Sequence, residues 1–287
     1  MFMFFPVLIG TSQIRPLAVT YLLPLLLLLL PHLVWADTGG LDADKDAQLA
    51  KKSQNPISKT INLPFEYEHN LQYGPFHRPE YELRAKPITL FTLNKNWDLY
   101  LRTIIPLMNV PSTTMPNVYN AGPGDINPNF YFSPTPVSDF HWGLGPGFMI
   151  PTATNPNLGA GKWSIGPAAV VVYSPRQWVI GFLASNLWSV GGVKSRPSYN
   201  QLSFQYFINY NFKHGWYLAT SSTNLANWGE NSSNRWTVPL GGGIGRAFHI
   251  GKQGFDCSFQ TYYNIKRPHT GNEVWSLQLS FSLLFPQ

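Results

Sequence analysis

The feature that most constrains this chain is a stretch, residues 202–212, in which apolar and polar side chains alternate. Leu202, Phe204, Tyr206, Ile208, Tyr210 and Phe212 share one face, and Ser203, Gln205, Asn209 and Asn211 share the other, with Phe207 as the exception. A helix would mix these two sets, whereas a strand separates them, because successive side chains of a strand point to opposite faces. The apolar face is as long as the roughly 9–11 residues that a tilted transmembrane strand needs. The pattern predicts a membrane-spanning strand.

The same alternation recurs along the chain beyond residue 57. Trp142 and Leu144, for example, stand opposite Gly143 and Gly145. The segments lie near residues 57–69, 81–93, 97–107, 124–133, 140–150, 163–174, 178–188, 200–212, 216–227, 235–249, 255–266 and 273–285. No apolar run of helix-spanning length accompanies them, and a closed barrel is the other structure that leaves no backbone group unpaired in lipid. We therefore predict an all-β fold, a single closed antiparallel transmembrane β-barrel of about twelve strands, over residues 57–287.

The connections between these segments alternate in length. Short joins are expected at residues 94–96, 134–139, 175–177, 213–215 and 251–254, and longer ones at 70–80, 108–123, 151–162, 189–199 and 228–234. Outer-membrane barrels have short periplasmic turns and longer external loops. An aromatic residue follows each short join, namely Trp97, Trp142, Trp178, Trp216 and Phe255. Because aromatic rings favour the level of the lipid headgroups, these residues predict a periplasmic aromatic girdle.

The N-terminus has the pattern of an export signal. Arg15 precedes a leucine-rich run, Leu22 to Leu30, and Ala36 is a small residue suited to cleavage. We expect residues 1–36 to be a cleaved signal peptide; the alternative, an uncleaved anchor, suits the run poorly because Pro24 and Pro31 interrupt it. Residues 37–56 are then a periplasmic segment, as a short helix, a mobile tail or a plug. The last strand, which ends at Phe285, is similar to the C-terminal signal that the outer-membrane assembly machinery recognises.

Composition narrows the function classes. Charged residues make up 12% of the 287 residues and aromatic residues 15%, against about 25% charged residues in ordinary soluble domains. The net charge of +6 is spread along the chain without a Lys/Arg cluster, so no nucleic-acid partner is expected. The single cysteine, Cys257, excludes an internal disulfide and a thiolate metal site. No histidine pair has metal-ligand spacing and no catalytic arrangement is recognisable, so we expect neither enzyme activity, nor a metal, nor a cofactor.

Directing the polar faces inward gives the predicted lumen two different walls. A charged wall, a candidate selectivity surface, consists of Glu66, Glu82, Arg84, Lys86, Asp98, Tyr100, Arg102, Asp125, Asn127 and Asn129, with Glu68 beside them. A small wall consists of Gly143, Gly145, Gly147, Gly166, Ala168 and Gly181. The charges form either a salt-bridge ladder that fills the interior or a surface that selects polar or anionic solutes. The small residues suggest that a solute, an inward-folded loop or the N-terminal segment packs against them.

Four segments resemble a known bacterial family: Leu49–Ser58, Gly124–Pro128, Gly161–Pro167 and Arg235–Gly243. This family of outer-membrane transporters is associated with the meta-pathway of phenol degradation, and its members are often mislabelled neuromedin U. The resemblance implies a barrel in the Gram-negative outer membrane. We expect a passive channel for small, aromatic or weakly apolar solutes, with outer-membrane lipid as its surroundings. A plugged structural or adhesive barrel is the alternative, and a lipid-modifying enzyme is the weakest hypothesis.

Overall fold

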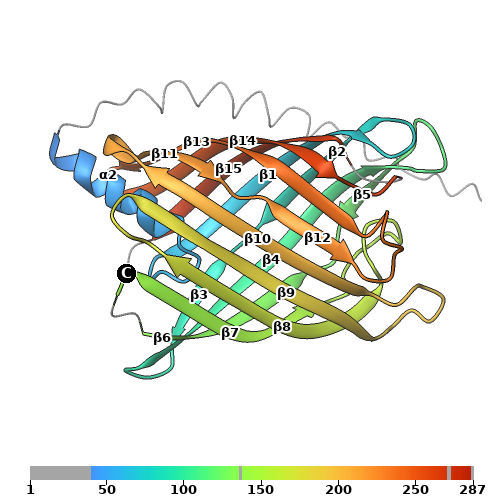
Figure 1. Cartoon of the computed structure of the whole chain (residues 1–287), viewed down its shortest axis with the longest axis horizontal. Helices are drawn as coiled ribbons and strands as arrows, with labels where there is room; N and C mark the ends of the chain where they lie inside the picture. The colour runs from blue at the N-terminus through green and yellow to red at the C-terminus, as the bar shows by residue number, and fades with distance from the viewer. Residues whose placement is uncertain (1–39, 136–137, 270–272, 286–287) are drawn as a thin grey trace, which may run out of the picture. The chain divides into compact units, whose positions relative to one another are not determined.

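The chain folds into an antiparallel barrel with one helix at an end (Figure 1). The structure, a computed structural model, describes residues 40–135, 138–269 and 273–285. Its elements are α2 (Gly40–Ser53), β1 (Ile61–Tyr73), β2 (Arg78–Ala85), β3 (Ile88–Thr92), β4 (Trp97–Pro111), β5 (Tyr119–Pro123), β6 (Asn127–Pro134), β7 (Phe140–Met149), β8 (Lys162–Tyr173), β9 (Trp178–Gly192), β10 (Asn200–Asn211), η1 (Lys213–Gly215), β11 (Trp216–Thr220), β12 (Thr223–Asn227), β13 (Trp236–Ile250), β14 (Gln253–Lys266) and β15 (Trp275–Phe285).

The barrel closes because its first and last strands pair. Strands β1 and β15 are antiparallel from Ile61 opposite Phe285 to Leu71 opposite Trp275. Three positions in the ring are each shared by two short strands, β2 with β3, β5 with β6, and β11 with β12, since both members of each pair contact the same neighbouring strand. The fifteen strands therefore form twelve positions around the barrel. The fold class and the strand number predicted from the alternation are confirmed.

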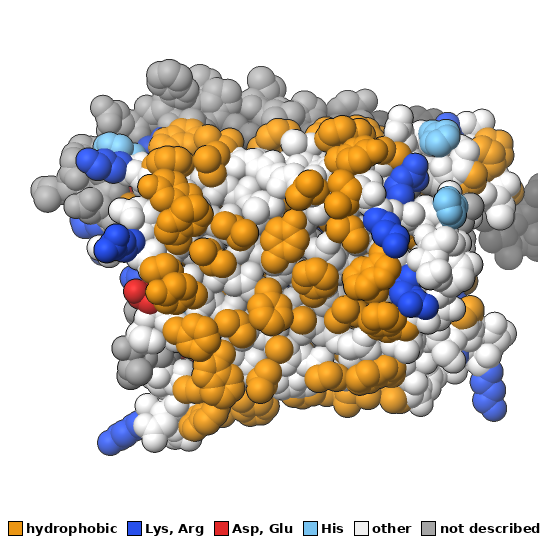
Figure 2. All heavy atoms as spheres, viewed as in Figure 1, with side chains coloured by type: hydrophobic (Ala, Val, Ile, Leu, Met, Phe, Trp, Pro, Cys, Tyr) orange, Lys and Arg blue, Asp and Glu red, His pale blue; other side chains and the backbone are white. Residues whose placement is uncertain are grey.

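The two faces of the strands are as the alternation predicts. On β10, Ile208 is exposed on the outside while Asn209 and Asn211 are buried inside. Phe207, the exception in the pattern, is also inside and buried, and its ring occupies the space beside Gly181. Figure 2 shows apolar side chains over the outer wall, with charged side chains toward the two ends. Within the described ranges, no helix is long and apolar enough to cross a membrane.

Tryptophans lie near both ends of the barrel. Trp97 and Trp142 contact each other edge to face at 6.2 Å beside the short turns, and Trp178 contacts Tyr210 in the same way at 4.8 Å. A second set, which the sequence analysis missed, lies at strand ends next to the long loops: Trp163, Trp188, Trp228, Trp236 and Trp275. Two aromatic belts with an apolar band between them match the two interfaces of a bilayer.

Residues 54–60 are not part of the first strand, although the alternation placed its start near residue 57. Strand β1 begins at Ile61, and the side chain of Ile57 is buried inside the barrel with 1% exposed. Hydrogen bonds from Ser58 N to Asn55 O and from Gln54 N to Ala50 O turn this segment back on α2. The local turn therefore replaces strand pairing over these residues.

Candidate functional site

A cavity of about 530 Å³ lies inside the barrel. Eight of the ten residues of the predicted charged wall line it: Glu66, Glu82, Arg84, Lys86, Arg102, Asp125, Asn127 and Asn129. Strands β1, β2, β4 and β6 supply most of these side chains, and the polar residues Gln201, Ser203 and Gln205 of β10 also line the cavity. Ligand cavities commonly measure about 300–1,000 Å³, so this one is large enough for a small solute.

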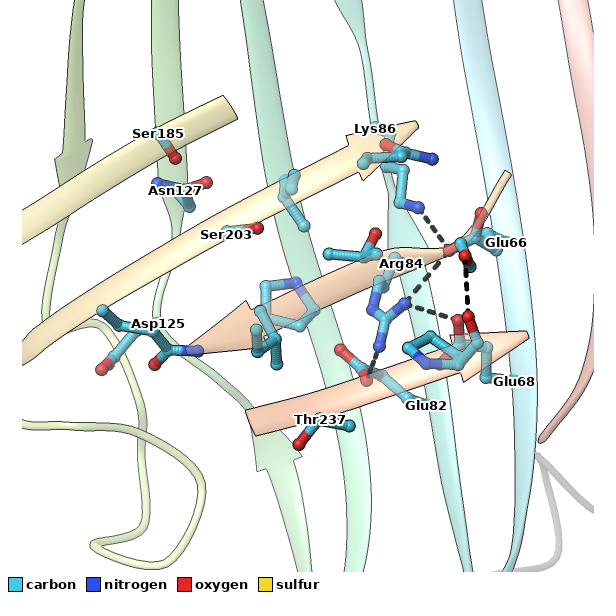
Figure 3. A pocket seen from close by; sticks show the side chains of 18 of the residues that line it. Glu66, Glu68, Glu82, Arg84, Lys86, Asp125, Asn127, Ser185, Ser203 and Thr237 are labelled. Atoms are coloured by element: carbon cyan, nitrogen blue, oxygen red, sulfur yellow. Dashed lines mark hydrogen bonds and ion pairs between the residues drawn. The ribbon is translucent and has the colours of Figure 1, made fainter. Parts of the chain in front are cut away.

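Arg84 is the centre of a carboxylate cluster on β1 and β2 (Figure 3). Its guanidinium lies 3.1 Å from Glu66, 2.7 Å from Glu68 and 2.5 Å from Glu82. Strand register explains this arrangement, because Glu66 is directly opposite Arg84 and Glu68 is directly opposite Glu82. Two like charges in opposite positions repel, and Arg84 offsets that repulsion by bridging them.

Further contacts complete this cluster. Lys86 forms an ion pair with Glu66, and Gln278 of β15 donates to the second oxygen of Glu66 at 2.7 Å. The side chains of Glu66 and Lys86 are each 10% exposed and that of Arg84 is 23% exposed. The three paired carboxylates are therefore structural partners of Arg84 and Lys86.

Arg102 differs from the other two cations. Its guanidinium donates to Gln205 Oε1 of β10 at 3.4 Å, and Gln205 in turn donates to Ser221 Oγ at 2.7 Å. No carboxylate among the described residues lies within 4.0 Å of it. One of the two alternatives for the charged wall, the salt-bridge ladder, includes Arg102; in the structure Arg102 lies outside the ion-pair network of Arg84 and Lys86.

Asp98 and Tyr100, the other two residues of the charged wall, do not line the cavity. Both are inside the barrel and fully buried. Tyr100 belongs to an apolar cluster with Ile57, Tyr131, Val170 and Phe207, and Asp98 accepts a hydrogen bond from Thr135 Oγ1 at 3.5 Å. Alternation gives the face of a residue but not what lies against it, and here apolar side chains occupy the interior.

The small wall packs against protein and does not line the cavity. A Cβ added to Gly145 would lie 2.1 Å from Phe130 O, one on Gly147 would lie 2.5 Å from Asn129 Oδ1, and one on Gly181 would lie 2.5 Å from the Phe207 ring. Gly143 lies against Tyr131 and Val170, Gly166 lies against Asn186 O, and Ala168 is buried in the apolar cluster. These residues make room for neighbouring strands and side chains.

The loop between β7 and β8 folds toward the cavity and is held there by Asp125. Asp125 Oδ1 accepts the backbone N–H of Ala153 at 3.0 Å, and Oδ2 accepts that of Ala160 at 2.6 Å. Gly159 passes so close that a Cβ would lie 2.4 Å from Asp125 Oδ1. Leu158, Gly159 and Ala160 consequently line the cavity.

Replacing Asp125 by alanine is expected to loosen this loop. A hydrogen bond to a charged acceptor contributes about 1.5–3 kcal/mol, so the amides of Ala153 and Ala160 should exchange with deuterium roughly 10- to 100-fold faster, since each 1.4 kcal/mol changes the open population tenfold. Hydrogen-exchange mass spectrometry measures this rate. The exposed Asp139→Ala variant is the matched control, and unchanged exchange over residues 151–161 in Asp125→Ala would contradict the anchoring role.

The helix α2 lies at the end of the barrel that carries the short turns (Figure 1). Leu49 and Ala50 pack with Tyr217, Ala219, Ala247 and Leu284 of three strands. Polar contacts surround this packing: Lys51 Nζ donates to Ser174 O at 2.9 Å, Ser53 Oγ donates to Asp256 Oδ2 at 2.6 Å, and Gln54 and Asn211 exchange amide hydrogen bonds at 2.9 and 3.0 Å. Asp46 also contacts His249 Nδ1 at 2.7 Å. The segment is therefore fixed to several sides of the opening.

Other predicted residues are placed as follows. Trp97, Trp142 and Trp178 are exposed on the outer wall, while Trp216 and Phe255 are partly covered, Trp216 by the Arg246 guanidinium at 5.5 Å and Phe255 by Phe248 at 5.7 Å. Cys257 faces outward between Phe255 and Phe259. The described part of the chain contains no group of three or more His, Cys, Asp or Glu side chains that could hold a metal ion.

Sequence reasoning missed two carboxylates of the cavity, Glu80 and Glu273. Glu80 lies in the segment 70–80, which was expected to be a long loop, and Glu273 is the first residue of the expected strand 273–285. Neither was assigned to the lumen. The alternation of Glu80 with Glu82 and Arg84 could have revealed the first, because all three share one face of β2.

Comparison with known proteins identifies the fold. No protein-family model matches the sequence, and no curated protein matches it. The structure is similar to that of an outer membrane channel from Pseudomonas putida F1, with a TM-score of 0.59 and 16% identity over 79% of this chain and 95% of the other. The NanC porin, at a TM-score of 0.48 and 10% identity over 79% and 100% of the chains, and an outer membrane phospholipase from Salmonella typhi, at 0.41 and 10% over 85% and 98%, are more distant. The chain therefore has the fold of an outer-membrane barrel.

Proposed function

We propose that this protein is a passive channel of the Gram-negative outer membrane for small polar solutes. The observation that carries the proposal is the cavity of about 530 Å³ inside a closed barrel. Its lining combines charged and polar side chains with apolar ones such as Met108, Met149 and Leu183. A barrel interior that served only as a packed core would not need charged side chains around a cavity, because burying a charge costs free energy. The fold shared with the Pseudomonas putida channel supports the same conclusion.

We also propose how the barrel is oriented in the outer membrane and how the chain reaches it. The short turns and α2 face the periplasm, and the long loops face outward, as in other outer-membrane barrels. Export uses the signal peptide at residues 1–36, which lies outside the described residues, and insertion uses β15 as the recognition strand for the assembly machinery. Outer-membrane lipid then surrounds the apolar wall.

The chemistry of the cavity favours polar solutes over the aromatic or apolar ones expected from the family resemblance. Six carboxylate side chains and three cationic ones line the cavity: Glu66, Glu68, Glu80, Glu82, Asp125 and Glu273, with Arg84, Lys86 and Arg102. Such a lining favours hydrated or hydrogen-bonding solutes and carries an excess of negative charge. A link to the phenol meta-pathway stays a prediction from the resemblance alone.

Conductance of the purified full chain in planar lipid bilayers tests the channel function. We expect discrete steps of current with a preference for cations over anions, because the lining carboxylates outnumber the cations. Absence of any step, together with no swelling of liposomes in small sugars or salts, would rule out the channel.

A second candidate, a plugged structural barrel, is favoured by one observation. Ile57, Val170, Val172 and Val179 form a packed apolar cluster inside the barrel with essentially no exposed surface. A barrel that keeps this cluster and α2 in place at all times would not conduct. The same conductance measurement separates the two functions.

If lipid surrounds the barrel, an introduced charge should destabilise it much more on the outer face of β10 than on the inner face. Phe204 faces outward, and Ser203 lines the cavity at the same depth. Phe204→Arg should cost about 2–4 kcal/mol of folding free energy in lipid vesicles, whereas Ser203→Arg should cost less than about 1 kcal/mol because its charge stays in the polar lumen. Urea titration of folding into vesicles measures both values, and equal costs would mean that lipid does not surround this wall.

A further inference from the structure

Two cavity carboxylates have no cation partner. Among the described residues, no Lys or Arg nitrogen lies within 4.0 Å of Glu80 or Glu273, whereas Glu66, Glu68 and Glu82 pair with Arg84 and Asp125 accepts two backbone amides. Glu80 is buried with 7% exposed. Both carboxylates line the same cavity.

Strand register brings Glu80 and Glu273 together with two asparagines. Asn70 of β1 is directly opposite Glu80 on one side and Ser276 on the other. Val274 N donates to Leu71 O at 3.0 Å, which places Glu273 beside the end of β1. Asn264 of β14 donates to Glu273 Oε1 at 3.0 Å, and Asn70 donates to Glu80 Oε2 at 3.1 Å.

Each asparagine gives its N–H to a glutamate and keeps an oxygen without a donor. Asn70 is 3% exposed and Asn264 is 4% exposed, and among the residues that the structure describes neither Asn70 Oδ1 nor Asn264 Oδ1 has a hydrogen-bond partner. Asn70 lines the cavity together with the two carboxylates. Buried oxygens are normally paired, and an unpaired one costs about 1–3 kcal/mol. The two carboxylates and the unpaired amide oxygens are all hydrogen-bond acceptors.

Tyr73 adds an aromatic ring to the same place. Gln72 has a φ of +58°, and the pairing of β1 with β2 shifts register between Asn70 and Tyr73. With this irregularity, Tyr73 lines the same cavity as Glu80 and Glu273. An aromatic face attracts a cation that lies over it.

We propose that Glu80, Glu273, Asn70 and Tyr73 bind the primary ammonium group of a small organic cation. An ammonium has three N–H donors and no acceptor, which matches two carboxylates and the free oxygen of Asn70. A metal ion is the weaker occupant, because metal sites of this kind use more oxygen ligands, about 6–8 for Ca²⁺. Passage of the cation through the barrel rests on the proposed channel function, whereas binding of the cation at this site does not require passage.

Isothermal titration of the full chain in nonionic detergent tests the site. The probes are n-butylammonium, tetramethylammonium and Ca²⁺, each as the chloride, added at pH 8. We expect n-butylammonium to bind, and Glu80→Gln and Glu273→Gln each to weaken it by about tenfold or more. Glu230→Gln, which removes the same charge from an exposed loop residue, is the matched control and should leave the affinity within about twofold.

Three outcomes would overturn the inference. Tetramethylammonium has no N–H, so binding as tight as that of n-butylammonium would show attraction by charge alone. An equal loss of n-butylammonium affinity in Glu230→Gln would also show attraction by charge alone. Tighter, Glu80-dependent binding of Ca²⁺ would make this a metal site. Glutamine keeps the acceptor for Asn70, so these variants should fold, which circular dichroism verifies. A chain that binds n-butylammonium but does not conduct would contradict the channel function and leave the site intact.

Discussion

Replacing Arg84 by glutamine is expected to lower the free energy of unfolding by about 4 kcal/mol. The substitution leaves Glu68 and Glu82 opposite each other with no cation between them, and leaves Glu66 with Lys86 alone. Removing one partner of a buried ion pair typically costs about 3–5 kcal/mol, because the remaining charge is neither solvated nor paired. Arg84 is 23% exposed to the cavity, and this partial solvation keeps the expected loss within that range.

Arg102→Gln is the matched control for this result. It removes the same charge from the same cavity, but its guanidinium has only a 3.4 Å hydrogen bond to Gln205, so we expect a loss below about 1 kcal/mol. Adding Glu68→Gln to Arg84→Gln should recover about 1–2 kcal/mol by removing the repulsion from Glu82. Urea denaturation in detergent, followed by tryptophan fluorescence, measures all three variants. Similar losses for Arg84→Gln and Arg102→Gln would mean that the cluster is well solvated.

The barrel could be predicted from the sequence because its determinants are local. Alternation with a period of two fixes which side of a strand faces lipid, and the turn residues fix where the strand reverses. Glu66 and Arg84 were assigned to one inner wall for the same reason, and the register then places them directly opposite each other.

The interior could not be predicted, because its contacts join residues far apart in the chain. Lys51 bonds to Ser174, and Ser53 bonds to Asp256, across separations of 123 and 203 residues. No local pattern encodes such pairs. The glycines of the small wall suggested space for a solute, an inward-folded loop or the N-terminal segment. In the structure, Phe130 O lies against Gly145 and the Phe207 ring lies against Gly181.

The segment that directly follows α2, residues 54–60, is bonded to the barrel wall. Gln54 and Asn211 exchange two amide hydrogen bonds at 2.9 and 3.0 Å, one residue being on the N-terminal segment and the other at the end of β10. Ile57, three residues further along, is buried in the apolar cluster. If solutes pass through this end of the barrel, we expect the segment to move, because its side chains pack against several strands there.

A reversible cross-link between residues 54 and 211 should therefore strongly reduce conductance. Gln54→Cys and Asn211→Cys are combined with Cys257→Ser, and a short bifunctional methanethiosulfonate joins the two thiols. We expect current steps to become at least about tenfold rarer after cross-linking, because disfavouring the open state by 1.4 kcal/mol or more lowers its population by that factor. The steps should return when dithiothreitol cleaves the linker. The two single-cysteine variants, treated in the same way, control for the reagent itself. Equal conductance before and after cross-linking, with cross-linking verified by mass spectrometry, would show that solutes pass without displacement of the segment and would place the gate elsewhere in the barrel.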